Sequence, residues 1–552
     1  MITVADYVAD FLVRKGIRHI FGFQGSAMLK MLDAIVGTGK IEYIQNFNEQ
    51  ASSFCADAYA RVKNDIGVAI ATSGPGAVNL IGGIANAYFD SVPAFFITGQ
   101  DYLSVLQSRG AARQNGFQDM DIVSMVQPVS KYAVTIQNPL DIRYELEKAY
   151  HLATSGRKGP VLIDVPIDIQ FAQIDETKLR QFSASSQKTE EPPEISEVIE
   201  ALKNARRPVI LVGGGIRQAG AAEALKHFAQ KTQIPVAATL NGIDAYDDIL
   251  GFGGLYGNSE ANLAILNADL LLVFGARFAV KHTGKKKELY NKAAKIIRIE
   301  IDDTEIDRTF IKNDICIKCD IKKFLQTITD RCFPSECLPW RKQIEEWKSL
   351  YADTICLAPQ YVCPISLIRA ISRHLQPQQI VTADVGANQM WTAQALRNKN
   401  GGRLLNSSGF GAMGYALPAA IGASYLSSLP IIAFMGDGGL QMNLQELNTL
   451  SLRRCNIKCF IFNNNNLGLM RDTQIRYYQS HFYGNNAKEF SCPDISLLAR
   501  TYKLKYIALN DNTEFEKLEQ ILSDNEPWLI DVKIDINTAV LNRYDDKALR
   551  NG

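Results

Sequence analysis

Short apolar runs alternate with helical patterns along nearly the whole chain, and this alternation constrains the fold more than any other feature. Nine such runs, most of them ending in Gly, Pro, Asn or Asp, are GVAIATSG, PAFFITG, GPVLIDVP, RPVILVGGG, ADLLLVFGAR, AKIIRIEID, LPIIAFMGDGG, IKCFIFNNNN and PWLIDVKI. Strands that are apolar on both faces and separated by helices form parallel sheets covered on both sides. We therefore predict an α/β protein of doubly wound parallel sheets.

The chain is too long for a single core. Its 552 residues correspond to three or four domains at about 150 residues per domain. The polar stretch 173–193 is typical of a linker, and a second break falls at 332–358, which is helical but interrupted by Pro334 and Pro339. We expect three α/β domains, at 1–172, 190–335 and 360–540, followed by a polar tail.

The amino-acid composition limits the kinds of molecule that the protein is expected to bind. The 59 basic and 58 acidic side chains leave a formal charge of +1, which argues against broad nucleic-acid binding. No apolar run approaches the length of a membrane-spanning helix. Segment 1–22 carries charges within its apolar positions and predicts a helix capped by Thr3 rather than a signal peptide. With ten scattered cysteines, we expect reduced thiols in a cytoplasmic enzyme acting on small molecules, with no nucleic-acid or membrane partner.

The most informative segment is Gly436-Asp437-Gly438-Gly439, which lies between a strand-like and a helix-like run. Glycines at such a turn let backbone N–H groups approach a phosphate, and Asp437 suggests a divalent cation beside it. About two dozen residues later comes the asparagine turn 463–466. One βαβ unit of this length brings the two turns together, so Asp437, Asn464 and Asn466 offer oxygen ligands suited to Mg²⁺.

These turns resemble the thiamine-diphosphate-binding motif, GDG followed by NN, and nearly the whole chain is similar to the acetolactate synthase group (acetohydroxyacid synthase large subunits). The other similar segments are NEQASSFCADAYAR, TSGPGAVN, TLNGIDAYDDILGFGGLYGN, FGARF, DVGANQMW and GFGAMGYALPAAIGA. The resemblance implies three domains of the pyruvate oxidase/decarboxylase type, with thiamine diphosphate and Mg²⁺ as cofactors. It also implies a carboligase that decarboxylates a 2-oxo acid, with pyruvate expected, and transfers a hydroxyethyl unit to a second carbonyl compound.

The resemblance assigns catalytic roles to three residues. Glu49 matches the glutamate that hydrogen-bonds the aminopyrimidine of the cofactor, and acid–base help of this kind contributes about 10²- to 10⁴-fold. Its presence argues against the glyoxylate carboligase subgroup. Phe117 and Gln118 match the pair that borders the reacting carbon, where a neutral amide can hydrogen-bond a developing alkoxide.

Further residues are expected to bind the cofactor. Met413 matches the apolar residue that bends the cofactor, and Gly411 would offer its carbonyl to the exocyclic amine. Asn388 aligns with a histidine that contacts the diphosphate, and Gln389 is expected there too, although Ala387 replaces a glutamine of the family. The remaining residues flank the pyrimidine or form the diphosphate turn: Ser73, Pro75, Gly76, Asn79, Gly436, Gly438, Gly439 and Asn466.

Four expected substrate positions include the departures from the family. Gly25 lies in a loop where relatives have Pro-Gly-Gly. Ile167 replaces a lysine, Lys281 replaces an arginine credited with holding the carboxylate of the second substrate, and Thr473 replaces a tryptophan associated with larger acceptors. Lys lacks the two-pronged grip of Arg. Together these changes suggest an altered acceptor.

The remaining expectations concern a flavin cofactor, alternative functions and the oligomeric state. GLYGN and FGARF resemble segments that line the flavin in acetolactate synthases, so we expect FAD as a largely structural cofactor. The turn Gly213–Gly215, which follows a strand-like run without a GxGxxG pattern, is a weak signal by itself. Alternatives to acetolactate synthesis are an acetyl-branching carboligase acting on a ketosugar or another polar acceptor, a pyruvate oxidase-type flavoenzyme, and a silent regulatory paralogue. The resemblance implies a homodimer or homotetramer, since relatives hold the cofactor between two subunits, and a possible regulatory subunit.

Overall fold

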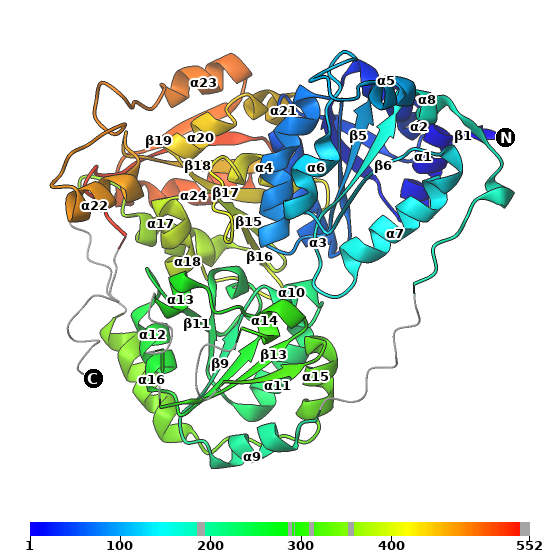
Figure 1. Cartoon of the computed structure of the whole chain (residues 1–552). Coiled ribbons are helices and arrows are strands. Elements are labelled where there is room, and N and C mark those ends of the chain that lie inside the picture. Colours follow the sequence, from blue (N-terminus) through cyan, green and yellow to red (C-terminus); the bar gives the residue numbers. More distant parts are fainter. Residues whose placement is uncertain (185–193, 285–289, 292, 309–313, 352–357, 541–552) are drawn as a thin grey trace.

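The computed structural model describes residues 1–184, 194–284, 290–291, 293–308, 314–351 and 358–540. Its core consists of three six-stranded parallel sheets, one in each of three domains. Figure 1 shows the N-terminal domain in blue and cyan beside the C-terminal domain in yellow to red, with the green middle domain below both. The predicted fold class is therefore confirmed.

The N-terminal sheet has the strand order β3-β2-β4-β5-β7-β6. Its strands are β2 (His19–Phe23), β3 (Glu42–Gln45), β4 (Gly67–Ala71), β5 (Ala94–Gln100), β6 (Tyr132–Thr135) and β7 (Val161–Pro166). Its helices are α1 (Val4–Arg14), α2 (Leu29–Gly37), α3 (Glu49–Lys63), α4 (Pro75–Phe89), α5 (Leu103–Ser108), α6 (Ile122–Val126), α7 (Ile142–Thr154) and α8 (Ile167–Phe171). Thr3 caps α1 as predicted, in a capping box with Asp6. The short strands β1 (Ile2–Thr3) and β8 (Gln173–Ile174) pair antiparallel.

The middle sheet has the order β11-β10-β9-β12-β13-β14, which is the 3-2-1-4-5-6 arrangement typical of dinucleotide-binding domains. Its strands are β9 (Pro208–Val212), β10 (Val236–Ala238), β11 (Ile249–Phe252), β12 (Leu270–Phe274), β13 (Lys295–Glu300) and β14 (Asp314–Lys318). Its helices are α9 (Ser196–Asn204), α10 (Gly215–Gln218), α11 (Ala222–Thr232), α12 (Ser259–Asn267), α13 (Val280–Thr283), α14 (Asp303–Ile306), α15 (Ile321–Thr329) and α16 (Leu338–Leu350).

The C-terminal sheet, β16-β15-β17-β18-β20-β19, repeats the order of the N-terminal sheet. Its strands are β15 (Ile380–Ala383), β16 (Arg403–Asn406), β17 (Ile431–Gly436), β18 (Ile457–Asn463), β19 (Lys505–Leu509) and β20 (Trp528–Lys533). Its helices are α17 (Pro364–His374), α18 (Ala387–Ala395), α19 (Ala416–Ser424), α20 (Asp437–Met442), α21 (Glu446–Leu452), α22 (Gly468–Tyr477), α23 (Ile495–Tyr502) and α24 (Leu518–Ser523).

Each sheet has a switch point, where the connections from two neighbouring strands lead to opposite sides, and ligands of open α/β sheets bind there. This switch point lies between β2 and β4, between β9 and β12, and between β15 and β17. The turns that follow these strands include Gly25, Gly213, Asp384 and Asp437. Topology therefore gathers most of the glycine- and asparagine-rich motifs of the sequence at three sheet edges.

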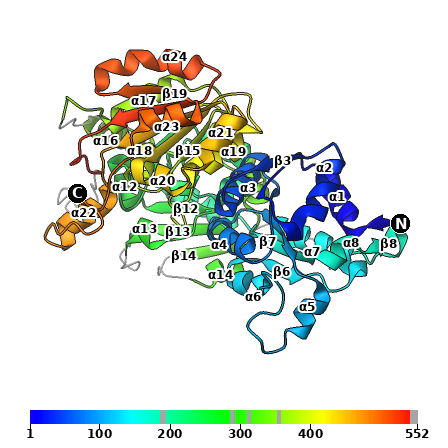
Figure 2. The same ribbon diagram turned by 90° about the horizontal axis from the view of Figure 1, so that it is seen from above.

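The N- and C-terminal domains share a core. Helix α3 packs on α19 (Figure 2), and Phe54 and Leu417 belong to one buried cluster. At the same boundary, Asp57 accepts hydrogen bonds from the buried Arg61 and from Tyr415, at 2.7 Å each. The contact fixes the direction in which α3 presents its first residue, Glu49.

All nine predicted apolar runs contain strands. Each predicted domain range holds one complete sheet, while its exact limits stay predictions. The helix expected after the diphosphate turn is split at 443–445 into α20 and α21. The predicted tail beyond Val540 and part of the first linker lie outside the described residues. Within the described part of the chain, no helix has the length and apolarity needed to cross a membrane.

Candidate active site

The turn after β17 brings Asp437 and Asn466 together. Strands β17 and β18 run parallel with Gly436 opposite Phe462, so the turns that follow them are neighbours. Asp437 is 2% exposed. Its Oδ1 accepts a hydrogen bond from the Gly438 N–H at 2.8 Å, and its Oδ2 accepts one from the Asn466 N–H at 3.2 Å. Burial raises the pKa of Asp437 to about 6, against the opposing effect of these backbone donors.

The donor set at this turn fits a hard divalent cation. The Asn466 amide donates to the Asn485 carbonyl at 3.2 Å, but its Oδ1 is buried with no hydrogen-bond partner among the described residues. An unsatisfied buried oxygen costs about 1–3 kcal/mol, a cost that a bound cation would offset. Asn464 is also buried. In the described residues, no three His, Cys, Asp or Glu side chains could hold a metal together, so this site offers one carboxylate and amide oxygens, which suit Mg²⁺.

Two glycines keep the turn open to close approach. A Cβ on Gly438 would lie 2.4 Å from Leu467 Cδ2 and 3.4 Å from Met413 Cε. A Cβ on Gly439 would lie 2.6 Å from Asp384 Oδ1. Only glycine fits at either position without displacement of a neighbour. The same contacts place Met413 directly at the turn, as the sequence-based assignment of both segments to one site requires.

Asp384 is a buried carboxylate that the sequence analysis did not select. It follows β15 at the switch point, and its two oxygens accept from the Gly414 and Ala416 N–H groups at 2.9 Å each. Burial raises its pKa to about 6. Gly411 and Gly414 have φ values of +76° and +80°, a region that favours glycine. Asp384 therefore anchors the turn that carries Met413; no sequence pattern marks it, because β15 before it is only four residues long and the Gly414 N–H that it accepts from lies 30 positions away.

The two amides expected at the diphosphate already bind protein acceptors. Asn388 Nδ2 donates to the Asp384 carbonyl at 2.7 Å and lies 3.5 Å from the Phe434 carbonyl. Gln389 Nε2 donates to Asn406 Oδ1 at 3.2 Å and to a backbone carbonyl at 3.1 Å. Both side chains lie at the start of α18, but their N–H groups face the protein.

A second cluster forms around Glu49 in the N-terminal domain. Glu49 is the first residue of α3, and the preceding Asn48 caps the helix by accepting from the Gln50 N–H at 2.8 Å. The Glu49 side chain is 7% exposed, and its Oε2 accepts from Asn79 Nδ2 at 2.9 Å. A Cβ on Gly76 would lie 3.2 Å from Glu49 Oε1.

The start of α4 and the neighbouring loop complete this cluster. Pro75 begins α4, and Ser73 is buried just before it. A Cβ on Gly25 would meet Thr72 at 2.5 Å, which places the Gly25 loop against the same turn. The hydroxyl of Thr72 is buried with no hydrogen-bond partner among the described residues.

The Phe117–Gln118 loop rests on the Glu49 cluster. Gln118 has a φ of +62°, and a Cβ on Gly74 would lie 2.8 Å from Gln118 Cβ. Phe117 is 78% exposed. The buried Asp119, which sequence reasoning missed, closes the loop by accepting from the Asn115 and Gly116 N–H groups at 3.1 and 3.2 Å. No hydrogen bond or ion pair between described residues joins this cluster to the Asp437 turn within one chain.

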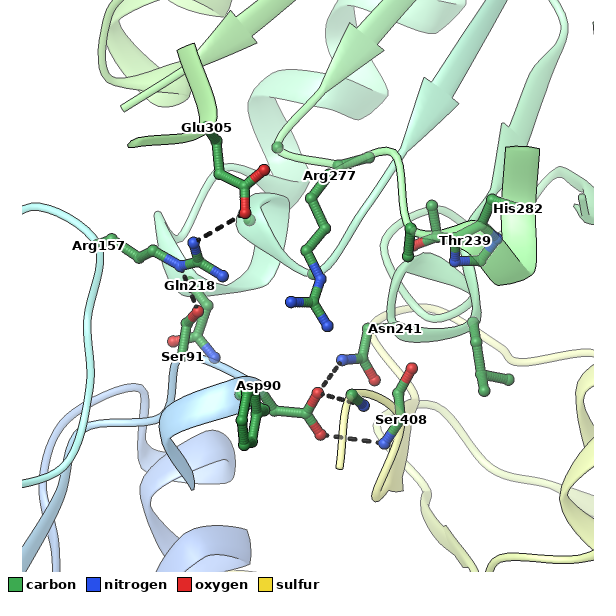
Figure 3. A pocket seen from close by; sticks show the side chains of 18 of the residues that line it. Asp90, Ser91, Arg157, Gln218, Thr239, Asn241, Arg277, His282, Glu305 and Ser408 are labelled. Atoms are coloured by element: carbon green, nitrogen blue, oxygen red, sulfur yellow. Dashed lines mark hydrogen bonds and ion pairs between the residues drawn. The ribbon is translucent and has the colours of Figure 1, made fainter. Parts of the chain in front are cut away.

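A cavity of about 680 Å³ lies at the switch point of the middle sheet, between all three domains (Figure 3). Its floor includes Gly214, Gly215 and Gly275, and a Cβ on Gly215 would lie 2.7 Å from Gly275 Cα. Asp90 closes one side, accepting from Asn241 Nδ2 at 2.9 Å and from two backbone N–H groups of the C-terminal domain.

Arg277 is one of the cationic side chains that line this cavity, with Arg157, Lys158 and Lys281. It lies at the end of β12 and lines the cavity, and no hydrogen bond or ion pair connects its side chain to another described residue. Figure 3 shows Arg277 reaching into the space between Arg157, Asn241 and Thr239. An uncompensated guanidinium in a glycine-floored cavity is suited to a phosphate group.

Of the four predicted substrate positions, Lys281 lines this cavity. Lys281, on α13, lines it together with Leu469 on α22. Thr473 lies one turn further along α22, and its hydroxyl donates to the Leu469 carbonyl at 2.9 Å. Ile167 begins α8 in the N-terminal domain, away from this rim. Within one chain, Lys281 lines the cavity, while Thr473, Ile167 and Gly25 are not among its lining residues.

Comparison with known proteins agrees with this arrangement. Sequence models described as thiamine pyrophosphate enzyme N-terminal TPP binding domain, central domain and C-terminal TPP binding domain match residues 2–125, 195–328 and 384–532. The chain is similar to proteins named acetolactate synthase large subunit. That of Cyanidium caldarium is 35% identical, with 96% of this chain and 92% of the relative covered. Those of Parasynechococcus marenigrum and Lactococcus lactis are each 34% identical, with 97% of this chain and 88% and 93% of the relatives covered.

Proposed function

This chain belongs to the thiamine pyrophosphate enzymes and is a carboligase of the acetolactate synthase type, and from this premise we propose that pyruvate is its donor substrate. The reaction splits carbon dioxide from the 2-oxo acid and joins the remaining two-carbon unit to a second carbonyl compound. Thiamine diphosphate, when bound, supplies the electron sink that this bond cleavage needs. The chain's own residues bind it, orient it and move protons.

In this proposal, the turn after β17 binds the diphosphate. Asp437, Asn464 and Asn466 are proposed to hold Mg²⁺ through oxygen atoms, and the backbone of Gly436–Gly439 to approach the phosphates. The Gly411–Met413 turn would support the thiamine rings from the side that Asp384 anchors. The observation that carries this proposal is the buried, unpartnered Asn466 Oδ1 beside the buried Asp437 carboxylate, within the part of the chain that the structure describes.

In this proposal, Glu49 is the residue that transfers protons. Its buried carboxyl can exchange a proton with the aminopyrimidine ring, while the Asn79 amide holds one carboxyl oxygen in place. Gln118 would hydrogen-bond the substrate oxygen without protonating the reacting carbon. Phe117, exposed in a single chain, would exclude water from the site once a second subunit covers it.

The test of this assignment is proton NMR of the purified protein with thiamine diphosphate, Mg²⁺ and pyruvate. Consumption of pyruvate that requires all three components is expected. Asp437→Asn should weaken Mg²⁺-dependent cofactor binding by about tenfold or more, because it removes the single carboxylate ligand. Pyruvate consumption without thiamine diphosphate, or undiminished Mg²⁺-dependent binding by the variant, would contradict the assignment.

The acceptor is the open part of the reaction. Lys281 and Thr473 stand where the resemblance gives the acetolactate synthases an arginine and a tryptophan, which makes an acceptor with more polar groups than a second 2-oxo acid the alternative to the acceptor expected from overall resemblance. We rank 2-acetolactate formation first and a ketosugar or similar acceptor second. NMR product analysis with pyruvate alone, and then with added ketosugars, separates the two. The double variant Lys281→Arg/Thr473→Trp should shift product toward 2-acetolactate if these residues select the acceptor.

FAD is proposed as the ligand of the cavity between the three domains. The dinucleotide-type strand order, the glycine floor and Arg277 support this choice. The purified protein should release a yellow chromophore on denaturation or take up FAD with a change in flavin fluorescence. Arg277→Met should weaken that binding. Consumption of oxygen during pyruvate turnover would instead favour the pyruvate oxidase-type alternative.

We further propose a homodimer as the minimal active unit, extended in some cases to a tetramer. The support is that the Glu49 cluster and the Asp437 turn make no hydrogen bond to each other between described residues of one chain. A regulatory subunit is proposed because the relatives are named large subunits. The near-neutral charge supports small-molecule substrates, and a cytoplasmic location stays a prediction.

A further inference from the structure

A buried carboxylate of the C-terminal domain reaches into the turn that precedes Glu49. Glu446, the first residue of α21, has no exposed surface. Its Oε2 accepts a hydrogen bond from Asn46 Nδ2 at 2.9 Å, and its Oε1 accepts one from the Phe47 N–H at 2.8 Å. Asn46 and Phe47 follow β3, and the turn they form ends at Asn48, the cap of α3.

The charge of Glu446 is stabilised by hydrogen-bond donors. Among the described residues Glu446 forms no ion pair, and Thr449 Oγ1, on its own helix, donates to Oε2 at 2.8 Å. Burial raises the pKa of Glu446, while the donors of Asn46 and Phe47 act in the opposite direction. Because Asn46 and Phe47 belong to the other domain, the carboxylate and the turn depend on each other.

The turn formed by residues 46–48 determines where Glu49 points. Glu49 stands two residues beyond Phe47, at the first position of α3, where the backbone direction is still set by the preceding turn. Without an acceptor from α21, the Phe47 N–H and the Asn46 amide would face a buried space with no oxygen to receive them. The turn would then relax, and the Glu49 carboxyl would move with it.

We propose that Glu446 is a positioning residue that fixes the 46–48 turn and thereby aims the Glu49 carboxyl at the cofactor. The inference rests on the proposed role of Glu49. It also gives segment 437–449 a second task, since the same stretch begins with the Asp437 ligand and ends with the support of the Glu49 turn.

The first test uses cofactor-free protein and Glu446→Gln, which keeps the shape of the side chain but replaces one acceptor oxygen by a donor. Amide hydrogen–deuterium exchange should become faster at Phe47 and Asn48 than in the wild type, while α23, in the same domain as Glu446, is unchanged. Unchanged protection of the turn in the variant would overturn the proposal.

The second test measures deuterium exchange at C2 of bound thiamine diphosphate, the proton that Glu49 helps to move. We expect Glu446→Gln to slow this exchange and kcat by about 10- to 100-fold, because small misplacements of a catalytic group cost about this much. The affinity for thiamine diphosphate and the KM for pyruvate should stay within about threefold, since neither diphosphate nor metal ligands are altered. An exchange rate within about twofold of the wild type would refute the positioning role.

An exposed ion pair that crosses the same domain boundary provides a matched control. Arg453 Nη1 lies 2.9 Å from Glu42 Oε1, and Nη2 donates to the Tyr43 carbonyl at 2.8 Å. Exposed pairs contribute little, so Arg453→Met should leave C2 exchange unchanged. An equal loss in Arg453→Met would show that any weakening of the boundary suffices, and would contradict a specific role for Glu446.

The double variant decides whether Glu446 acts through Glu49. In a Glu49→Gln background, Glu446→Gln should change C2 exchange by less than about twofold, whereas independent roles would multiply. If Glu446→Gln does not fold, Asn46→Ala removes one of the two donors and should slow exchange in the same direction. A wild type that does not accelerate C2 exchange over free cofactor would contradict the proposed function itself.

Discussion

Replacing Glu49 by glutamine changes one proton-carrying group while leaving its packing in place. The carboxyl is 7% exposed, and a Cβ placed on Gly76 would lie only 3.2 Å from its Oε1. Glutamine fills the same volume, and with its oxygen toward Asn79 it keeps the 2.9 Å hydrogen bond. The variant should therefore fold with wild-type stability.

The expected loss lies in the rate. General acid–base help contributes about 10²- to 10⁴-fold, which corresponds to about 3–5 kcal/mol of transition-state free energy. Cofactor affinity should change by less than about threefold, since the interactions that Glu49 makes in the bound complex are few compared with those of the diphosphate and metal. The Asp437 turn, which provides those interactions, makes no hydrogen bond to Glu49 within the described chain.

Two measurements separate these effects. Titration of the variant with thiamine diphosphate at saturating Mg²⁺ gives the affinity, and pyruvate consumption under the same conditions gives kcat. Glu42→Gln is the control, because Glu42 is an exposed glutamate of the same domain. A Glu49→Gln variant with a near-normal kcat would refute the acid–base role. Equal losses of affinity and rate would show that Glu49 only binds the cofactor.

Three further predictions follow from individual contacts. Asp164 is buried, and burial raises its pKa to about 7 from an ordinary value of 3.8, in spite of donors from Thr98, Thr135 and Gln100. The folded state then holds a proton that the unfolded state has released, so the contribution of Asp164 to stability should fall by about 3 kcal/mol between pH 4 and pH 7. Chemical denaturation of Asp164→Asn should lack this part of the pH dependence, and an equal slope in both proteins would contradict it. Gly438→Ala should lower stability by about 1–3 kcal/mol, because its Cβ would meet Leu467 at 2.4 Å, whereas Gly37→Ala, with open space around it, should not; equal melting temperatures of the two variants would count against the tight turn. Mixing Glu49→Gln protein with Asp437→Asn protein after dissociation should restore activity if each site takes Glu49 from one subunit and Asp437 from the other, and no recovery in a verified mixed dimer would contradict the shared site.

The sequence was sufficient for the parts of the fold that local pattern encodes. Long apolar runs such as LPIIAFM and IKCFIF became central strands because both faces of a parallel sheet are covered. The strands β15 and β16, of four residues each, carry too little apolar pattern to be selected in this way. The break between α20 and α21 was also missed, because 443–445 contains no proline or glycine.

The candidate site also has a part that local sequence pattern predicts and a part that it does not. The turn with Asp437 and Asn466 could be assembled from the βαβ spacing alone, because β17 and β18 are consecutive strands. The roles of Asp384 and Glu446 could not be predicted in this way, because the groups that they bind lie about 30 and 400 positions away in the sequence. A buried carboxylate reveals its role only when the donors that face it are known.

The central claim is that this chain uses thiamine diphosphate to join two carbonyl compounds through the Asp437 and Glu49 clusters. Proton NMR of purified protein with thiamine diphosphate, Mg²⁺, FAD and pyruvate tests it most directly. We expect pyruvate to disappear with formation of 2-acetolactate, or, if Lys281 and Thr473 select another acceptor, with formation of a branched product once a ketosugar is added. Failure to consume pyruvate with any acceptor, by protein shown to bind thiamine diphosphate, would contradict the proposed donor and reaction.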